Sequence, residues 1–275
     1  MSGLDREFAR LRLTEAEDRV TVTLDHAPTR NAIDQQMVDE LHAICAELER
    51  QPRILILTGA NGLFVSGADI AQLKERRRDD ALLGINSGIF DRIARLPMPV
   101  IAALEGYALG GGAELAYAAD FRIATPNLKI GNPETALGIM AAAGATWRLK
   151  ELVGEPLAKE ILLAGRQLTA QEALACHLIT EIHEPDDLLT AAHALADRIA
   201  QQDALAVRIT KSVFHTPREV HPLIDNLAQG MLFESDAKFA RMQGFLDAKA
   251  ERRARRAAQE ATKSEASAPD TEGQE

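Results

Sequence analysis

Short, wholly apolar segments recur along the first half of the chain, and helix-like segments separate them. Residues 54–57 and 100–104 are aliphatic throughout, which is typical of strands buried on both faces of a sheet. Residues 34–50 place apolar side chains at helical spacing, with Asp34 as the expected N-cap. The repeated order of strand, crossover and helix predicts a largely parallel sheet in an α/β domain.

Weaker patterns complete the expected elements. Further strands are expected over residues 8–13, 20–24, 121–124 and 128–130, and a helix over residues 81–96. The pattern from about residue 145 onward predicts helices over 145–153, 156–164, 170–177, 187–201, 204–215 and 218–248. We therefore expect an α/β core over 1–195 and a helical region over 196–250. The tail, 251–275, is charged and poor in apolar groups, so it is expected to be disordered.

Charge and composition narrow the classes of function. The net charge of −10 at pH 7 argues against a nucleic-acid partner, because an acidic surface repels phosphate backbones. Residues 1–12 lack an apolar signal core, and no apolar run is long enough to cross a bilayer, so we expect a cytoplasmic protein with no membrane partner. The 7 histidines show no metal-ligand spacing, and we expect no metal site.

A glycine-rich segment, Gly110 to Gly112 followed by Ala113 and Glu114, precedes a predicted helix. Consecutive glycines let the backbone approach a ligand closely and leave amide donors free for an anion or a developing oxyanion. The alternative is a flexible turn with an acidic residue in the first turn of the helix, where the helix dipole favours it. A dinucleotide-binding fingerprint is excluded, because its last glycine position holds leucine.

Two further segments carry polar groups at the ends of predicted strands. Gly67, Ala68 and Asp69 lead into a short helix and offer a second set of backbone amides, or simply a helix N-cap. Asn132 and Glu134 lie in a loop after a short strand, where a carboxylate either reaches a pocket or decorates a turn.

Taken together and in order, these segments resemble the crotonase (enoyl-CoA hydratase/isomerase) superfamily. The matching stretches are Gly-Ala-Asp-Ile at 67–70, Ala-Leu-Gly-Gly-Gly-Ala-Glu-Leu at 108–115 and Gly-Asn-Pro-Glu with a following Leu-Gly at 131–138. Further matches lie at residues 28–32, 161–165 and 168–173, and the resemblance covers roughly residues 8–249. It implies a crotonase-like core of stacked β-β-α turns in a spiral, and a C-terminal helical trimerisation region that assembles a homotrimer or a dimer of trimers.

The resemblance also implies the chemistry of the site. The backbone N–H groups of Ala68 and Gly111 fall at the family's oxyanion hole, which binds a thioester carbonyl. Glu114 and Glu134 fall on the two positions where family hydratases carry glutamates. By this analogy Glu114 deprotonates the water that attacks C3, and Glu134 supplies the proton to C2. Two carboxyl groups in one apolar cleft should differ in protonation, because burial and mutual repulsion disfavour a double anion.

Retention of both glutamates favours an enoyl-CoA hydratase acting on 2-enoyl-CoA thioesters in fatty-acid metabolism, with coenzyme A as part of the substrate and no separate cofactor. Other crotonase reactions remain open, namely isomerisation, thioester hydrolysis and hydration of a cyclic or dienoyl substrate. A non-catalytic CoA-binding homologue is a further alternative.

Two residues differ from the family pattern at positions where they could change which substrate binds. Ala142 stands where a water-contacting glycine is expected, and Trp147 replaces a glutamine. Trp147 either reshapes the acyl end of the pocket or belongs to the core. Expected contacts to substrate or CoA, beside Ala68, come from Asp69, Ile70, Lys74, Gly110, Trp147, Phe245 and Lys249, with Arg76–Arg78 as further basic candidates.

Overall fold

The structure is a computed structural model that describes residue 4 and residues 7–266. The chain divides into two compact units, Met1–His215 and Thr216–Glu275.

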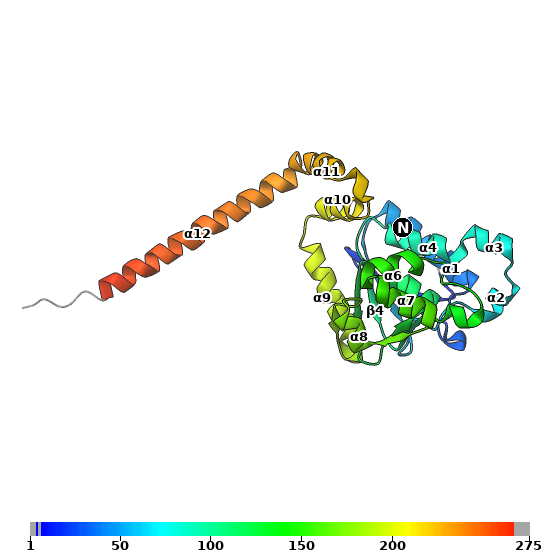
Figure 1. The fold of residues 1–275 in the computed structure, drawn as a ribbon. Coiled ribbons are helices and arrows are strands. Elements are labelled where there is room, and N and C mark those ends of the chain that lie inside the picture. The colour runs from blue at the N-terminus through cyan, green and yellow to red at the C-terminus, as the bar shows by residue number, and fades with distance from the viewer. Residues whose placement is uncertain (1–3, 5–6, 267–275) are drawn as a thin grey trace, which may run out of the picture. The chain divides into compact units, whose positions relative to one another are not determined.

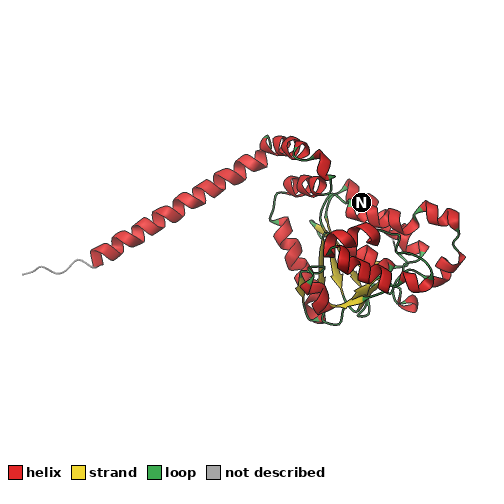
Figure 2. Ribbon diagram, in the orientation of Figure 1, coloured by secondary structure: helices red, strands yellow, loops and turns green. Residues whose placement is uncertain are grey.

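A six-stranded sheet forms the centre of the first unit (Figures 1 and 2). Only the first two strands pair antiparallel, and every later neighbour pairs parallel, as the apolar segments predict. In spatial order its strands are β1 (Leu11–Glu15), β2 (Arg19–Leu24), β3 (Ile54–Gly59), β4 (Val100–Leu104), β6 (Phe121–Ala124) and β9 (Glu181–Ile182).

Both faces of this sheet are covered, which explains the unbroken apolar runs. Successive strand residues point to opposite faces, so Leu55 and Leu57 join the main core while Ile54 and Ile56 join a second cluster. The second cluster includes the buried apolar residues of α9 (Leu188–Ala200), among them Ala192.

A second sheet of three strands carries the loops that matter for the site. Its order is β5 (Tyr107–Leu109), β7 (Lys129–Gly131) and β8 (Gln167–Thr169). Strands β5 and β7 run parallel, so their carboxyl ends lie side by side. The Gly110 turn follows one strand and Asn132 follows the other, and the Gly110 N–H donates to the Gly131 carbonyl at 2.9 Å.

Helices surround the two sheets (Figure 2). Those of the first unit are α1 (Gln35–Arg50), α2 (Ile70–Glu75), α3 (Arg78–Leu83), α4 (Ile85–Ala94), α5 (Gly111–Tyr117), α6 (Ala145–Val153), α7 (Glu155–Ala164), α8 (Ala170–Ala175), α9 and α10 (Ala204–Phe214). Helix α1 begins after Asp34, whose side chain accepts from the Met37 N–H as the sequence predicts. The helix expected over 81–96 is wrong in one respect: Gly84, at φ 63°, separates α3 from α4.

The second unit holds α11 (Leu223–Phe233) and α12 (Asp236–Ala266). The single helix expected over 218–248 is therefore wrong, because the chain leaves helical geometry between Phe233 and Asp236. The first compact unit ends at His215, and α12 includes residues 251–266 of the expected tail. The rest of that tail, 267–275, lies outside the described residues. The division into a core over 1–195 and an oligomerisation region over 196–250 stays a prediction.

Candidate active site

The glycine-rich turn brings the start of α5 against the neighbouring loop. Gly110 has φ 51°, a conformation that favours glycine. A Cβ atom on Gly112 would lie 2.6 Å from Val65 Cβ, closer than two carbon atoms can approach. Glycine at these two positions therefore permits the turn and the close packing that fix α5 in place.

Two backbone amides meet at this turn. A Cβ atom built on Gly111 would lie 3.6 Å from the amide nitrogen of Ala68, so the two residues are in close contact. Among the described residues, neither the Ala68 N–H nor the Gly111 N–H has a hydrogen-bond acceptor. For Gly111 this follows from its place at the start of a helix, where amides have no acceptor within the helix. Two unused donors side by side can bind one oxygen that carries partial negative charge.

Glu114 lies in the first turn of α5 with its side chain buried. Its Oε1 accepts hydrogen bonds from the N–H of Ala143 at 2.7 Å and of Ala145 at 3.1 Å. The pKa of Glu114 is raised to about 7: burial is the main cause, the charge of Glu134 adds to the rise, and the two backbone donors oppose it. A carboxyl group with this pKa can exchange protons near neutral pH.

Glu134 begins a 3-10 helix, Glu134–Leu137, directly after the second loop. Asn132 Nδ2 lies 3.3 Å from Glu134 Oε1, and its Oδ1 accepts from the Tyr117 hydroxyl at 3.0 Å. Glu134 Oε2 is buried and has no hydrogen-bond partner among the described residues. Burial is the main cause that raises the pKa of Glu134, and the Asn132 amide opposes it.

The carboxyl group of Glu134 lies against Gly110, and it is close enough to Glu114 for its charge to raise the pKa of that residue. A Cβ atom on Gly110 would lie 3.2 Å from Glu134 Oε1. The Gly110 carbonyl accepts from the Glu114 N–H at 3.0 Å and lies 3.4 Å from Asn132 Nδ2. Two amide donors and two carboxyl groups of raised pKa therefore surround one turn, an arrangement that can stabilise an oxyanion and move protons beside it.

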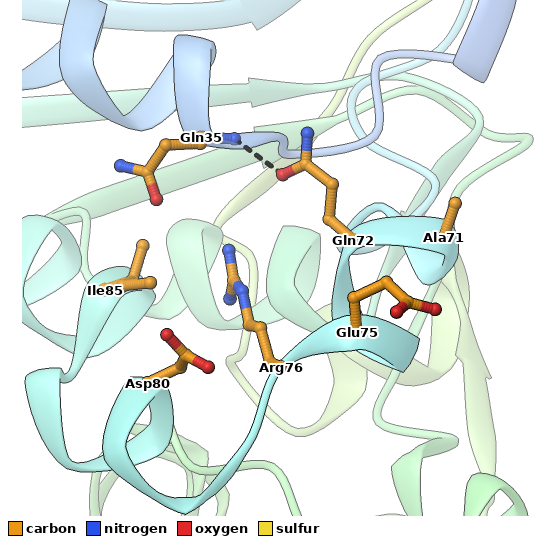
Figure 3. A pocket seen from close by; sticks show the side chains of 7 residues that line it. All are labelled: Gln35, Ala71, Gln72, Glu75, Arg76, Asp80 and Ile85. Atoms are coloured by element: carbon orange, nitrogen blue, oxygen red, sulfur yellow. Dashed lines mark hydrogen bonds between the residues drawn. The ribbon is translucent and has the colours of Figure 1, made fainter.

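A polar hollow lies between the start of α1 and helices α2, α3 and α4 (Figure 3). The Arg76 side chain extends into it, and the Gln72 side chain accepts from the Gln35 N–H at 2.9 Å (Figure 3). The residues that line this hollow are Gln35, Ala71, Gln72, Glu75, Arg76, Asp80 and Ile85.

Comparison with known proteins gives the family. The profile of the enoyl-CoA hydratase/isomerase family matches residues 15–258. The chain belongs to the enoyl-CoA hydratase/isomerase family. The short-chain-enoyl-CoA hydratase of Clostridium acetobutylicum is 35% identical to this family member over 233 residues, which are 82% of this chain and 87% of that protein. The crotonyl-CoA hydratase of Syntrophomonas wolfei is 34% identical over 233 residues, which are 82% of this chain and 87% of its own.

Solved enoyl-CoA hydratase/isomerase structures share the fold, which confirms the predicted α/β crotonase core. An enoyl-CoA hydratase subunit of Geobacillus kaustophilus superposes with a TM-score of 0.83 at 30% identity, covering 88% of this chain and 96% of that one. An enoyl-CoA hydratase structure of Thermobifida fusca in complex with CoA gives a TM-score of 0.75 at 28% identity, covering 85% and 95%.

The CoA contacts expected at α2 are of two kinds. The Asp69 side chain already has a hydrogen-bond partner within the protein, whereas the Ile70 and Lys74 side chains are exposed. The Asp69 carboxylate caps α2 by accepting from the Gln72 N–H at 2.8 Å, and the Asp69 N–H donates to Ile33. The helix-cap interpretation therefore accounts for the Asp69 side chain. Ile70 and Lys74, on the same helix, expose their side chains and stay predicted CoA contacts.

The remaining expected contacts lie elsewhere. Trp147 is 48% exposed, which excludes the core interpretation, and the Arg148 guanidinium stacks over its ring at 3.9 Å from the centroid. Ala142 is exposed, between the buried Ala141 and Ala143. Phe245 and Lys249 lie on α12 in the second unit and stay predictions.

Sequence reasoning missed several groups at the site. The N–H groups of Ala143 and Ala145 donate to the Glu114 carboxyl group. Almost every residue type has a backbone N–H, so the sequence does not indicate which ones act as donors here. Asn132 stands two residues before Glu134, and this spacing is the one signal from which its role beside that carboxyl group could have been inferred. Asn86, on α4, was also missed.

Over residue 4 and residues 7–266, no three His, Cys, Asp or Glu side chains group in a way that could hold a metal ion. In the same residues, no helix combines the length and apolar character that a membrane crossing requires.

Proposed function

We propose that this protein is an enoyl-CoA hydratase that adds water across the 2,3 double bond of a 2-enoyl-CoA thioester to give a 3-hydroxyacyl-CoA. The observation that carries the proposal is the pair of buried carboxyl groups, Glu114 and Glu134, beside two unused backbone donors. The names of the relatives, among them short-chain-enoyl-CoA and crotonyl-CoA hydratases, support the same reaction.

In the proposed reaction the thioester oxygen accepts hydrogen bonds from the N–H groups of Ala68 and Gly111. These donors stabilise the enolate that forms when water attacks C3, because they are fixed before the charge develops. Glu114 takes the proton from the attacking water, the C3–O bond forms, and the C2–C3 π electrons move into the enolate. Glu134 then gives its proton to C2, which restores the thioester carbonyl.

The hydrogen bonds of the two carboxyl groups fit these roles. Both backbone donors bind Glu114 Oε1, which fixes the side chain and leaves Oε2 for the water. The buried Glu134 Oε2 has no partner among the described residues, so a proton on it is free for transfer to carbon. A cleft that excludes bulk water strengthens each of these interactions.

The other parts of the proposal concern binding and assembly. Coenzyme A enters as part of the substrate, and its proposed contacts are Gly110, Ile70 at the start of α2 and Lys74 in the last turn of α2. Trp147, Phe245 and Lys249 are further proposed contacts. We also propose a homotrimer or a dimer of trimers in the cytoplasm, acting in β-oxidation or a related route of lipid metabolism without a separate cofactor.

Substitution of each glutamate tests the function. Glu114→Gln and Glu134→Gln should each lower kcat for crotonyl-CoA hydration by about a thousandfold or more, because both groups transfer protons in the same reaction. Loss of the enone absorbance and a mass gain of one water measure turnover. Glu105→Gln, at a glutamate outside the cleft, is the matched control and should keep full activity. Full activity in either glutamate variant would contradict the proposal.

A further inference from the structure

Asn86 carries a carboxamide that has no hydrogen-bond partner in the described part of the chain. It is the second residue of α4. Its Oδ1 is buried and has no hydrogen-bond partner among the described residues, and none of their hydrogen bonds reaches its Nδ2. A buried carbonyl without a donor is unfavourable, because it has given up its hydrogen bond to water. Such a group inside a ligand-binding region indicates that the ligand supplies the missing partner.

The Asn86 amide faces the proposed thioester site. A Cβ atom built on Gly111 would lie 3.7 Å from Asn86 Nδ2 and 3.6 Å from the Ala68 amide nitrogen. Asn86 is therefore close to the turn that presents the two backbone donors. These donors already serve the thioester oxygen, so the carboxamide is available to a different atom of the acyl group.

A hollow with several polar side chains at its border begins one residue before Asn86. Ile85, the chain neighbour of Asn86, lines this hollow, into which Arg76 extends and which Gln35 and Gln72 border (Figure 3). An aliphatic chain placed here would cover charged and amide groups without pairing them, which costs free energy. An acyl group that carries its own oxygen pairs with them instead.

Building on the proposed hydratase function, we propose that Asn86 hydrogen-bonds a hydroxyl group of the acyl chain close to the double bond, so that hydroxylated enoyl-CoA thioesters are preferred to plain aliphatic ones. A hydroxyl group donates to Oδ1 and accepts from Nδ2, so it can pair with the carboxamide whichever way the amide is turned. A keto oxygen could only accept and would leave Oδ1 unpaired.

The test compares two probes that differ by one hydroxyl group, 4-hydroxycrotonyl-CoA and crotonyl-CoA. The ratio of their kcat/KM values is measured for the wild-type chain and for Asn86→Leu, which has similar volume and no hydrogen-bonding group. We expect the substitution to shift the ratio about tenfold toward crotonyl-CoA, the loss typical of one buried hydrogen bond. Ser87→Ala, one position along α4, is the matched control and should leave the ratio unchanged.

The outcomes separate this inference from the proposed function. An equal effect of Asn86→Leu on both probes, or no effect, would overturn the inference while leaving the hydratase function standing. Failure of the wild-type chain to add water to either probe, or full activity of Glu114→Gln, would overturn the function itself. The melting temperature of Asn86→Leu establishes that the variant is folded, and Asn86→Ala provides a second variant with the same expected direction if it is not.

Discussion

Glu114 and Glu134 are positioned near each other by different local elements. Glu114 projects from the first turn of a buried helix, and Glu134 follows a strand that pairs with the strand before that helix. The sequence could predict both residues, because each stands in a motif with glycine or asparagine beside it. It could not predict the Ala143 and Ala145 donors, since any residue except proline supplies a backbone N–H.

The raised pKa values predict the pH profile of the reaction. The active pair holds one proton, which Glu114 holds in the free protein while Glu134 is charged, and which must lie on Glu134 when Glu114 accepts the proton of water. Activity therefore requires a pH above the lower pKa of the pair and below the higher one. Burial raises the pKa of Glu114 to about 7 and raises that of Glu134 as well. We therefore expect kcat/KM for crotonyl-CoA to fall as pH rises above about 7, when the pair loses its last proton. A profile that stays flat from about pH 6 to pH 9 would be inconsistent with a shared proton.

The same shift predicts a stability gain in an inactive variant. The folded protein holds the Glu114 proton more tightly than the unfolded chain, because the pKa rises from 4.5 to about 7. Folding stability is therefore lost as pH rises through this window, by about 3 kcal/mol at most. Glu114→Gln keeps an acceptor for the two backbone donors and cannot ionise.

Urea unfolding of the wild-type chain and of Glu114→Gln measures this effect. The free energy of unfolding of the variant should exceed that of the wild-type chain by up to about 3 kcal/mol near pH 8, and by little near pH 4.5. A difference that does not change with pH would show that the folded state does not hold this proton more tightly.

At the scale of the element, the α5 turn depends on glycine for packing rather than for flexibility. A Cβ atom on Gly112 would lie 2.6 Å from Val65 Cβ and 2.7 Å from the Val65 carbonyl oxygen. Gly112→Ala should therefore lower the free energy of unfolding by about 1–3 kcal/mol, the usual cost of overpacking, and displace α5 with Glu114. Chemical denaturation and the rate with crotonyl-CoA measure the two effects.

Gly88 provides the matched control for that substitution. It lies inside α4, and nothing stands within 4 Å of an added Cβ atom. Gly88→Ala should raise the free energy of unfolding by about 0.5–1 kcal/mol, because alanine is the better helix former. Equal effects of the two substitutions would mean that the approach to Val65 does not constrain α5.

Elements were predicted best where the local pattern was strong. The strand over 100–104 and the helix over 145–153 coincide with β4 and α6. The break at Gly84 was missed, because glycine within an apolar helical pattern is compatible with a continuous helix. The break before Asp236 was missed because its residues have no strong turn signature.

At the scale of the whole molecule, the order of motifs identified the family, and the family carries the fold. Assembly stays a prediction. Large apolar side chains are exposed along α11 and α12, among them Leu223 at 66% and Phe245 at 63%. In a single sequence, apolar residues that contact another copy look the same as ordinary exposed apolar residues. The sequence alone therefore could not predict the assembly.

Isotope labelling tests the proposed chemistry most directly. Crotonyl-CoA is converted by the wild-type chain in water enriched in oxygen-18 and, separately, in deuterated water, and the products are analysed by mass spectrometry and NMR. Hydration between Glu114 and Glu134 predicts an intact thioester with one oxygen-18 at C3 and one deuterium at C2. A free acid labelled in its carboxylate, or a displaced double bond carrying deuterium without oxygen-18, would contradict it.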